Sequence, residues 1–228
     1  MATLTWLGHA SFRLDTDGGK RIYVDPFLNG NPKTPDSEKD PERVDIIALT
    51  HGHGDHVGDT VALSQKFPDA PIVALVELKG WLGGQGANVG ELPGINKGGT
   101  QEIDGIRFTL TNAFHSSSSE EGAYLGEPAG IVIRFDGKSI YFAGDTCVFG
   151  DMALIARLYK PDLVVLPIGD WFTMGPEEAA LALELLGNPR CVPCHYGTFG
   201  LLTGTPDALA SLTSATVEKI EPGDGVEL

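Results

Sequence analysis

Three histidines and one aspartate lie within six residues of the chain, in the segment THGHGDHVGD. Imidazole nitrogens and carboxylate oxygens are the ligands that zinc, iron and manganese accept in proteins. His51 and His53 are two residues apart, so both side chains point the same way in an extended segment. Asp55 and His56 follow where the chain turns into a predicted helix. One short loop could therefore serve two metal ions, which lie about 3.5–4 Å apart in binuclear sites.

Further ligands for two ions follow other predicted strands. His115 follows the apolar segment IRFTLTNAF, Asp145 follows SIYFAG, and His195 follows RCVPC. Because His51 also follows a predicted buried strand, VDIIALT, these side chains can meet at one edge of the molecule. A solvated polar loop or a single structural metal would not need so many ligands on one turn. The pattern therefore predicts a binuclear centre.

The segment CVPCH at residues 191–195 has the spacing C-x-x-C-H, which is the string of covalent haem attachment. A redox dithiol and a pair of zinc thiolates are alternative interpretations of the same letters. Haem attachment belongs outside the cytoplasm, whereas an odd number of cysteines and an N-terminus unlike a secretory signal favour a reducing cytoplasm. We therefore expect Cys191 and Cys194 to pack as small hydrophobes on a buried strand. His195 is then the functional residue of the segment, and Cys147 is not expected to be a ligand.

The charge and hydropathy of the chain exclude several classes of partner. Sixteen basic and 31 acidic residues give a net charge of −15, which repels phosphate backbones, so nucleic acid is not expected as a partner. No apolar run approaches the roughly 18 residues that span a bilayer. With 42% hydrophobic residues among 228, the chain can bury a large core without disulfides. We expect a cytoplasmic protein that acts on a small molecule.

The predicted elements fall into two halves that repeat the same order. The segment FRLDTDGGKRIYVDP parallels VIRFDGKSIYFAGDT, and each contains a strand, a turn and a strand followed by an aspartate, Asp25 or Asp145. The buried strands VDIIALT and PDLVVLP come next, then predicted helices over residues 57–67 and 176–186, then the strands PIVALVE and RCVPC. This shared order predicts a duplicated half-unit.

Two sheets packed face to face, with helices outside, satisfy this order in one domain over residues 1–228. Functional residues then lie at strand ends where the halves meet, which is a usual place for a cleft. The polar loops 29–43 and 115–130 are expected beside this cleft. Part of its wall is expected from the segment after the buried strand of the second half: Asp170, Trp171, Thr173 and Met174.

The metal motifs resemble those of the metallo-β-lactamase superfamily. HGHGDH, the later His115, GDT at residues 144–146 and CHYGT at residues 194–198 match its pattern. LGHASF, VDPF and PIGDWFTMGPEEA are similar to its branch of metal-dependent hydrolases close to the L-ascorbate-6-phosphate lactonases, so the resemblance covers essentially the whole chain. It implies a four-layer αββα sandwich of two related halves, in the α/β (α+β) class.

The resemblance also implies a ligand set and a reaction. One ion would be held by His51, His53 and His115, and the other by Asp55, His56 and His195, with Asp145 bridging. Hydroxide bound between the two divalent ions would attack a small ester, with a lactone favoured, because metals lower the pKa of bound water to about 7. Zinc is the first choice of metal, with manganese, iron or nickel as alternatives. The resemblance leaves a homo-oligomer open.

Two residues outside this ligand set are expected to assist the reaction. Asp25 would accept a hydrogen bond from a ligand imidazole and fix its tautomer. His9 either contacts the substrate or donates a proton, or it is a hydrogen-bonded structural residue. Asp55 is the other candidate for proton transfer.

Three other functions remain open. A phosphodiesterase or nuclease could use the same centre, although the net charge opposes it. A di-iron redox protein could be built on the same scaffold, although the related flavoproteins need a second, flavin-binding domain, for which 228 residues leave no room in this chain. A non-catalytic metal-binding module would not need the complete ligand set. No arginine or lysine lies within a metal motif, so the phosphate of the known lactonase substrate has no matching basic residue.

Overall fold

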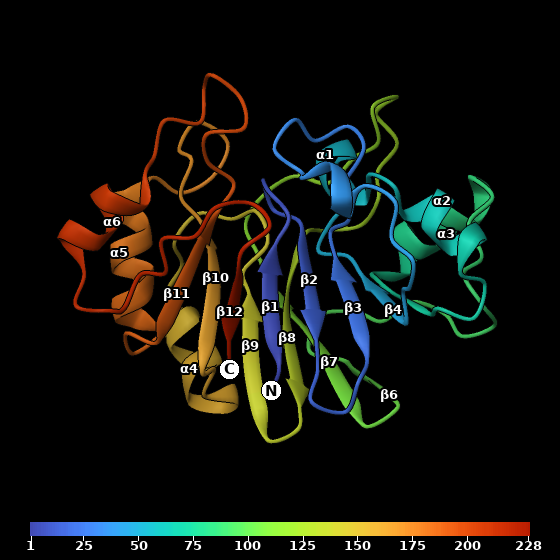
Figure 1. The fold of residues 1–228 in the computed structure, drawn as a ribbon, viewed down its shortest axis with the longest axis horizontal. Helices are drawn as coiled ribbons and strands as arrows, with labels where there is room; N and C mark the ends of the chain where they lie inside the picture. Colours follow the sequence, from blue (N-terminus) through green and yellow to red (C-terminus); the bar gives the residue numbers. More distant parts are fainter.

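Two six-stranded sheets form the centre of the protein, which a computed structural model describes over residues 1–228 (Figure 1). From edge to edge, the first sheet contains β12 (Gly225–Glu227), β1 (Thr3–Trp6), β2 (Phe12–Asp15), β3 (Arg21–Val24), β4 (Ile46–Ala48) and β5 (Ile72–Val73). The second sheet contains β11 (Arg190–Cys194), β10 (Leu163–Pro167), β9 (Lys138–Phe142), β8 (Ala129–Phe135), β7 (Ile106–Asn112) and β6 (Thr100–Ile103).

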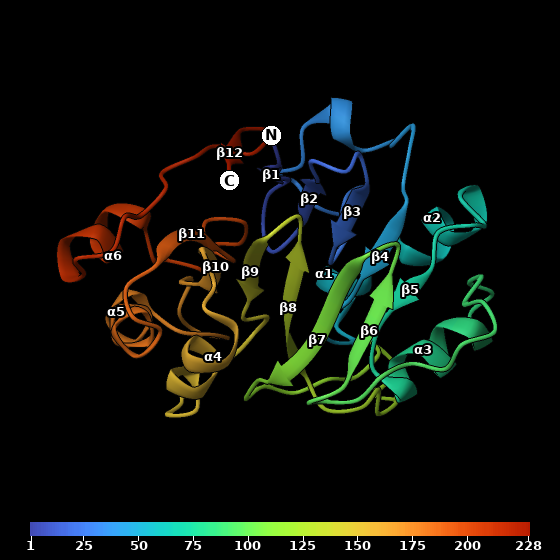
Figure 2. The ribbon, with the colours of Figure 1, turned by 90° about the horizontal axis from the view of Figure 1, so that it is seen from below.

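Helices cover the outer faces of both sheets, and the short helix α1 (Gly54–Val57) lies beyond the ends of the strands (Figure 1). The others are the 3-10 helix η1 (Asp36–Glu38), α2 (Thr60–Lys66), α3 (Val76–Gly84), α4 (Met152–Tyr159), α5 (Pro176–Leu185) and α6 (Pro206–Leu212). Figure 2 shows α2 and α3 beside β4 and β5, whereas α4, α5 and α6 lie beside β10 and β11. None of these helices has the length and apolar composition needed to cross a membrane. The predicted αββα sandwich is confirmed.

The two sheets share one pattern of strand pairing. In the first sheet β2 and β3 pair antiparallel, and β3–β4 and β4–β5 pair parallel. In the second sheet β8–β9, β9–β10 and β10–β11 repeat this pattern. The equivalent strands β3 and β9 each end shortly before an aspartate, Asp25 and Asp145. The two halves therefore have the same topology, in agreement with the repeated order of the sequence.

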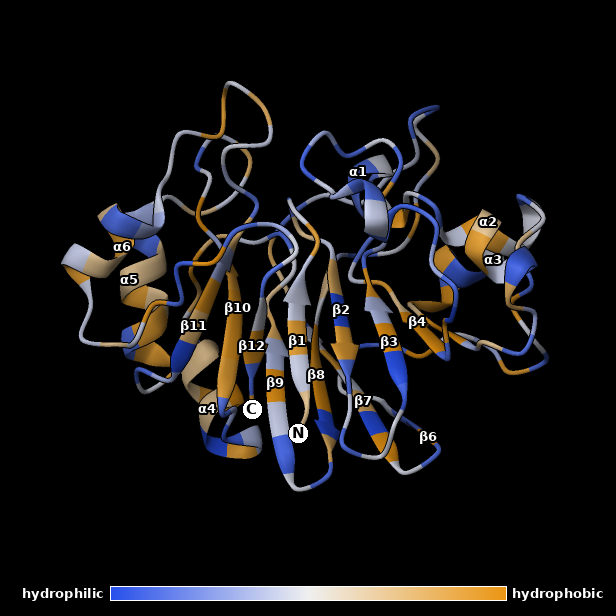
Figure 3. Ribbon diagram, viewed as in Figure 1, coloured by the Kyte–Doolittle hydropathy of each residue, from blue (hydrophilic) through white to orange (hydrophobic).

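Apolar side chains of both sheets pack against each other between the layers. A cluster of 40 buried residues draws on both sheets, and within it the rings of Phe12 and Phe142 lie 5.7 Å apart. A second cluster of 15 residues joins α4 and α5 to the outer face of the second sheet. β10 is buried at every residue and hydrophobic along its length (Figure 3), as expected for a strand covered on both faces.

The helix predicted over residues 57–67 corresponds to α2, which begins at Thr60, and a separate short helix, α1, precedes it. The chain turns at Gly58, whose φ is 34°, and a Cβ there would lie 2.5 Å from Phe27 Cα. A glycine is required at this close approach because it has no side chain and accepts positive φ. The break leaves α1 as a separate single turn that carries Asp55 and His56.

The strand predicted over residues 71–77 is shorter than expected. β5 comprises two residues, and α3 begins at Val76. The β-branched residues of this segment suit a strand, but β5 is the edge of the sheet and the chain leaves it at once. Leu78 and Leu82 of α3 are then fully buried against the main core. Packing of this helical face decides the local structure against the strand propensity.

The loop over residues 29–43 packs against the first sheet and does not border the cleft. Arg13 of β2 donates a hydrogen bond to Glu38 of η1, and the Thr34 hydroxyl donates to the carbonyl oxygen of Leu7 at 2.7 Å. No residue of this loop lines the cavities beside the predicted ligands. The expectation that this loop flanks the site is therefore wrong, because its polar groups are engaged with the sheet.

Candidate metal centre

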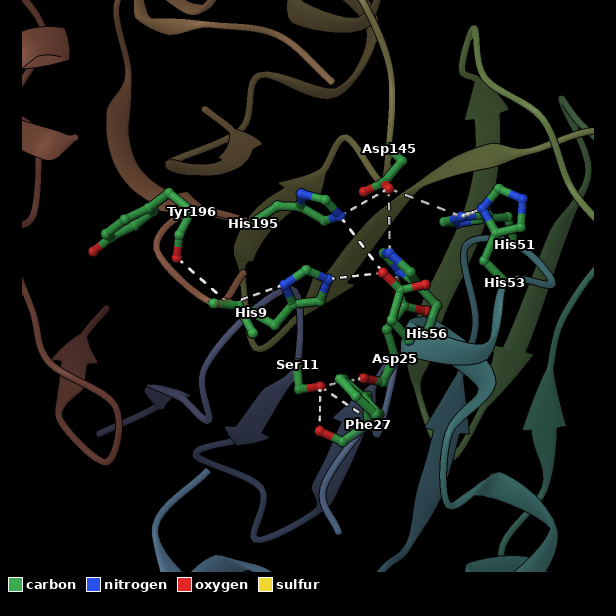
Figure 4. Close-up of polar contacts among 12 residues, drawn as sticks. His9, Ser11, Asp25, Phe27, His51, His53, His56, Asp145, His195 and Tyr196 are labelled. Atoms are coloured by element: carbon green, nitrogen blue, oxygen red, sulfur yellow. Dashed lines mark hydrogen bonds and ion pairs between the residues drawn. The ribbon is translucent and has the colours of Figure 1, made fainter. Parts of the chain in front are cut away.

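The histidine-rich loop begins where β4 ends and closes into α1 (Figure 4). His51 is fully buried, and His53 precedes α1 in an extended conformation with φ −70° and ψ 150°. Asp55 and His56 then lie in the single turn of α1. The change from extended to helical backbone places the two pairs of side chains in different groups of predicted ligands. This arrangement agrees with a loop that serves two ions.

Four imidazole rings converge on one carboxylate oxygen of Asp145, and Figure 4 labels His195, His56 and His51 among them. The distances to Asp145 Oδ2 are 3.1 Å from His195 Nε2, 3.3 Å from His56 Nε2, 3.6 Å from His115 Nε2 and 4.0 Å from His51 Nε2. The lone pairs of one oxygen cannot accept a hydrogen bond from every ring. In addition, Asp145 Oδ1 and His56 Nε2 are buried without a hydrogen-bond partner. Buried polar atoms normally have partners, so this donor set fits metal ions.

The atoms of the predicted ligands, together with those of His9, form three groups, and within each group the atoms lie within 4.8 Å of one another. The groups are His51, His53 and His115; then His9, Asp55, His56 and His195; then His51, His56 and Asp145. The third group contains one member of each of the others, so Asp145 lies between them. The structure therefore brings together all seven residues predicted as ligands, and their arrangement can hold two neighbouring ions.

Asp25 lies directly behind His56, where the sequence predicted a supporting carboxylate. Its side chain accepts hydrogen bonds from the Thr50 N–H at 2.8 Å and the Thr50 hydroxyl at 2.6 Å, and it lies 2.8 Å from His56 Nδ1. A carboxylate only accepts, so Nδ1 of His56 carries the proton. The Nε2 lone pair of a neutral His56 is then available to a metal.

His9 lies behind Asp55 and is fully buried. Its Nε2 donates to Asp55 Oδ2 at 2.9 Å, and its Nδ1 lies 3.0 Å from the Thr198 hydroxyl. Burial lowers the pKa of His9 to about 4 despite the hydrogen bond with Asp55, so the ring is neutral near pH 7. The position does not agree with the expectation that His9 contacts the substrate, because both ring nitrogens are occupied by protein groups.

Burial and buried carboxylates shift the pKa values of the predicted ligands in opposite directions. Burial holds the pKa of His51 well below its ordinary value. Burial also opposes charge at His195, but Asp145 and Asp55 together outweigh it and raise the pKa of His195 to about 9. The pKa of His56 is raised in the same way, because Asp145 and Asp25 outweigh its burial. Protons on His56 and His195 therefore balance the carboxylates, and bound metal would replace these protons.

A cavity of about 350 Å³ opens onto the predicted ligands. It is lined by His53, Asp55, His115, Ser116, Asp145, Phe172 and His195. An adjoining cavity of about 560 Å³ shares Asp55 and Phe172 with it. Both volumes lie in the range of small-molecule sites.

The segment after β10 contributes Phe172 to this wall, and not the residues predicted there. Asp170 and Trp171 have φ values of 66° and 60°, so the chain reverses at these residues. Asp170 lines a different cavity beside α5, and Trp171 is 68% exposed. Met174 is fully buried in the second core cluster, and the Thr173 hydroxyl is buried without a partner. The expectation that these four residues form the wall of the cleft is therefore wrong.

The two cysteines of CVPCH pack in the cores on either side of β11. Cys191 belongs to the cluster beneath α4 and α5, and Cys194 belongs to the cluster between the sheets. Both are buried, and burial raises the pKa of both thiols. The prediction that they behave as small hydrophobes is confirmed, and His195 is the residue of this segment that reaches the site.

Four residues beside the centre were not named individually from the sequence: Ser116, Glu120, Phe172 and Thr198. Ser116 and Glu120 belong to the loop 115–130 that was expected beside the cleft, and they line the two cavities there. Thr198 is the last residue of the motif CHYGT. Ser116 Oγ lies 3.4 Å from His53 Nε2. Phe172 reaches the site only through the course of its loop, for which the sequence offers no periodic pattern.

Known proteins with similar sequences and structures include metal-dependent hydrolases. A profile of the β-lactamase superfamily domain matches residues 20–196. A UPF0173 metal-dependent hydrolase from Herpetosiphon aurantiacus is 50% identical over 233 residues, which cover 97% of this chain and 96% of that protein. Another from Rubrobacter xylanophilus is 49% identical over 209 residues, which cover 90% of this chain and 85% of that protein. The solved structure of Igni18, a metallo hydrolase from the hyperthermophilic archaeon Ignicoccus hospitalis, superimposes with a TM-score of 0.86 at 34% identity, covering 99% of this chain and 97% of that chain.

Proposed function

The chain belongs to the metal-dependent hydrolases of the β-lactamase superfamily, and from this premise we propose that it hydrolyses a small ester, with a lactone favoured, at a binuclear metal centre. The observation that carries the proposal is the convergence of four imidazole nitrogens within 4.0 Å of Asp145 Oδ2. One ion would be held by His51, His53 and His115, and the other by Asp55, His56 and His195, with Asp145 between them. Zinc suits this set of nitrogen and oxygen donors, as do manganese, iron and nickel.

Two divalent ions in this site would polarise a carbonyl oxygen and lower the pKa of a water molecule towards neutrality. The side chains then orient the reactants and move the proton. Asp55 suits proton transfer because it borders the cavity with its side chain 31% exposed. Burial raises the pKa of Asp55, but hydrogen bonds from His195 and His9 outweigh it and keep the group ionised. We assign His9 the role of positioning Asp55, since it has no surface in the cavity.

The lining of the cavity favours an uncharged ester over a phosphorylated substrate. No lysine or arginine lines either cavity beside the predicted ligands. A phosphate group bound there would depend on the metal ions alone for charge compensation, without the bidentate contacts that arginine gives to phosphate. Phosphodiesterase and nuclease activities are therefore outcomes for the test and not part of the proposal.

The proposal is tested with a panel of lactones, carboxylic esters, phosphodiesters and amides, using protein loaded with zinc, manganese, iron or nickel. We expect hydrolysis of lactones or esters, its loss in Asp145→Asn, and its retention in Asp59→Asn, which changes a carboxylate outside the site. Turnover of phosphodiesters alone would contradict the ester assignment. Oxygen consumption by the iron form with a reductant would favour a redox protein. No turnover of any substrate would favour a non-catalytic metal-binding module.

We also propose that the protein works in the cytoplasm on a small molecule. All three cysteines are free thiols, which suits a reducing compartment. The two cavities are of a size for small molecules. Fractionation of the native host, followed by detection of the protein in the soluble or membrane fraction, tests the compartment.

A further inference from the structure

The larger cavity beside the centre is lined by apolar side chains and carboxylates. We name this space, of about 560 Å³, the apolar annex; it is lined mainly by Phe27, Phe172, Phe199, Leu201, Asp55 and Glu120. Phe172, Phe199 and Leu201 are 51%, 42% and 48% exposed. Large apolar side chains that gather half exposed around one cavity mark a binding surface.

The annex adjoins the part of the centre where Asp55 lies. Phe172 and Asp55 line both the annex and the cavity over the predicted ligands. The rings of Phe27 and Phe199 pack edge-on against His9, with centroid distances of 6.0 Å and 5.3 Å. His9 in turn holds Asp55 by a hydrogen bond of 2.9 Å. A group bound in the annex would therefore lie next to the carboxylate that we assign to proton transfer.

The charges around the annex are negative. Asp55 and Glu120 are its two ionisable lining residues, and no lysine or arginine lines it. Glu120 lies over the start of α1, with Oε1 3.1 Å from the position of a Cβ on Gly54. An anionic group bound here would be repelled by two carboxylates and would find no basic partner.

We propose that the annex receives an uncharged apolar substituent, an alkyl chain or an aryl ring, of the ester or lactone hydrolysed at the neighbouring centre. This inference rests on the proposed function and adds the class of substrate. The apolar walls supply binding free energy to the substituent, and the two carboxylates discriminate against acidic substituents. Substrates with a phosphate or carboxylate at this position are excluded on the same grounds.

The experiment measures binding and turnover along two matched series. Zinc-loaded protein is titrated calorimetrically with n-alkyl hydroxamates of two to eight carbons, whose head groups bind metal. In parallel, kcat/KM is measured for p-nitrophenyl esters of the same chain lengths. We expect both affinity and kcat/KM to rise about fourfold per methylene until the annex is filled. A chain of equal length that ends in a carboxylate should bind about fivefold more weakly or worse, and Glu120→Gln should reduce this difference.

For each variant the readout is the slope, which is the factor by which affinity or kcat/KM rises per added methylene. A variant that lowers activity equally for every chain length does not change this slope. Leu201→Ala and Phe199→Ala should lower the slope to less than twofold per methylene. Leu212→Ala is the matched control, since Leu212 is 51% exposed but lines a separate cavity beside α6. Its slope should equal that of the wild type.

The outcomes separate the two proposals. Ester turnover with no dependence on chain length, or an unchanged slope in both Leu201→Ala and Phe199→Ala, would overturn the annex as a subsite. Chain-length-dependent binding of hydroxamates without turnover of any ester would overturn the proposed function and support the annex. Failure of every hydroxamate to bind and of every ester to turn over would overturn both.

Discussion

Asp25→Asn tests whether the carboxylate of Asp25 sets the tautomer of His56. Asp25 is 1% exposed, and its Oδ1 accepts the Thr50 N–H at 2.8 Å. Its Oδ2 accepts the Thr50 hydroxyl at 2.6 Å and the His56 Nδ1–H at 2.8 Å. Asparagine has the same shape and tolerates the left-handed backbone at this position, where φ is 46°. The perturbation is therefore confined to hydrogen bonding.

The Asp25→Asn side chain cannot satisfy all three contacts. If its oxygen keeps the Thr50 N–H, its amide group donates to His56 Nδ1, and the proton of His56 moves to Nε2, where it blocks the metal. If the amide is flipped, two N–H donors face each other at Thr50, and a buried unsatisfied donor costs about 1–3 kcal/mol. Loss of such a support typically weakens metal binding about 10- to 100-fold, or about 1.4–2.7 kcal/mol. We expect this loss at the ion bound to His56.

Competition with a chromophoric zinc chelator measures the affinities of the two ions, and circular dichroism establishes that the variant is folded. Asp59→Asn is the matched control, since Asp59 Oδ2 accepts the N–H groups of Leu28 and Asn29 at 2.7 Å and 3.0 Å and has no imidazole partner. It should keep both affinities. A folded Asp25→Asn protein that binds both ions as tightly as the wild type would refute the tautomer argument.

Two further predictions concern the thiols and pH. Cys191→Ser and Cys194→Ser each place a hydroxyl in an apolar core, so the free energy of unfolding should fall by about 1–3 kcal/mol in urea titrations, while the metal content stays unchanged; lost metal would assign the thiols to the site. Metal affinity should fall as the pH is lowered from 8 to 6, because the raised pKa of His195, about 9, keeps a proton on the metal-free protein that the ion must displace. Each displaced proton changes the apparent binding constant about tenfold per pH unit, and a flat profile in competition titrations would contradict this account.

The elements that carry the centre could be predicted because their signals are local. Three histidines and an aspartate in six residues limit the chemistry without any knowledge of the fold, and the apolar run before them indicates the strand that places them. His195 could be predicted in the same way, because it directly follows the apolar segment RCVPC and therefore lies at the end of a predicted strand. The hairpins β2–β3 and β8–β9, which begin the shared pairing pattern of the two sheets, are also local in sequence, because each consists of two strands joined by a short turn.

The walls of the site could not be predicted in the same way. Phe172 enters the cavity because Asp170 and Trp171 adopt positive φ, a conformation that their residue types do not require. Val76 starts a helix where β-branched residues suggested a strand, because the apolar face of that helix packs on the core. The burial of His9 depends on contacts with Asp55 and Thr198, which are distant in sequence. Such features depend on tertiary packing, which no short window of sequence contains.

The most direct test of the binuclear centre is the number of metal ions per chain, measured by elemental analysis of purified protein and its variants. We predict two divalent ions per chain in the wild type. Asp55→Ala and His56→Ala should each retain one, because the ligands on the His51 and His53 side of Asp145 remain intact. One tightly bound ion in the wild type, unchanged in Asp55→Ala and His56→Ala, would contradict the account.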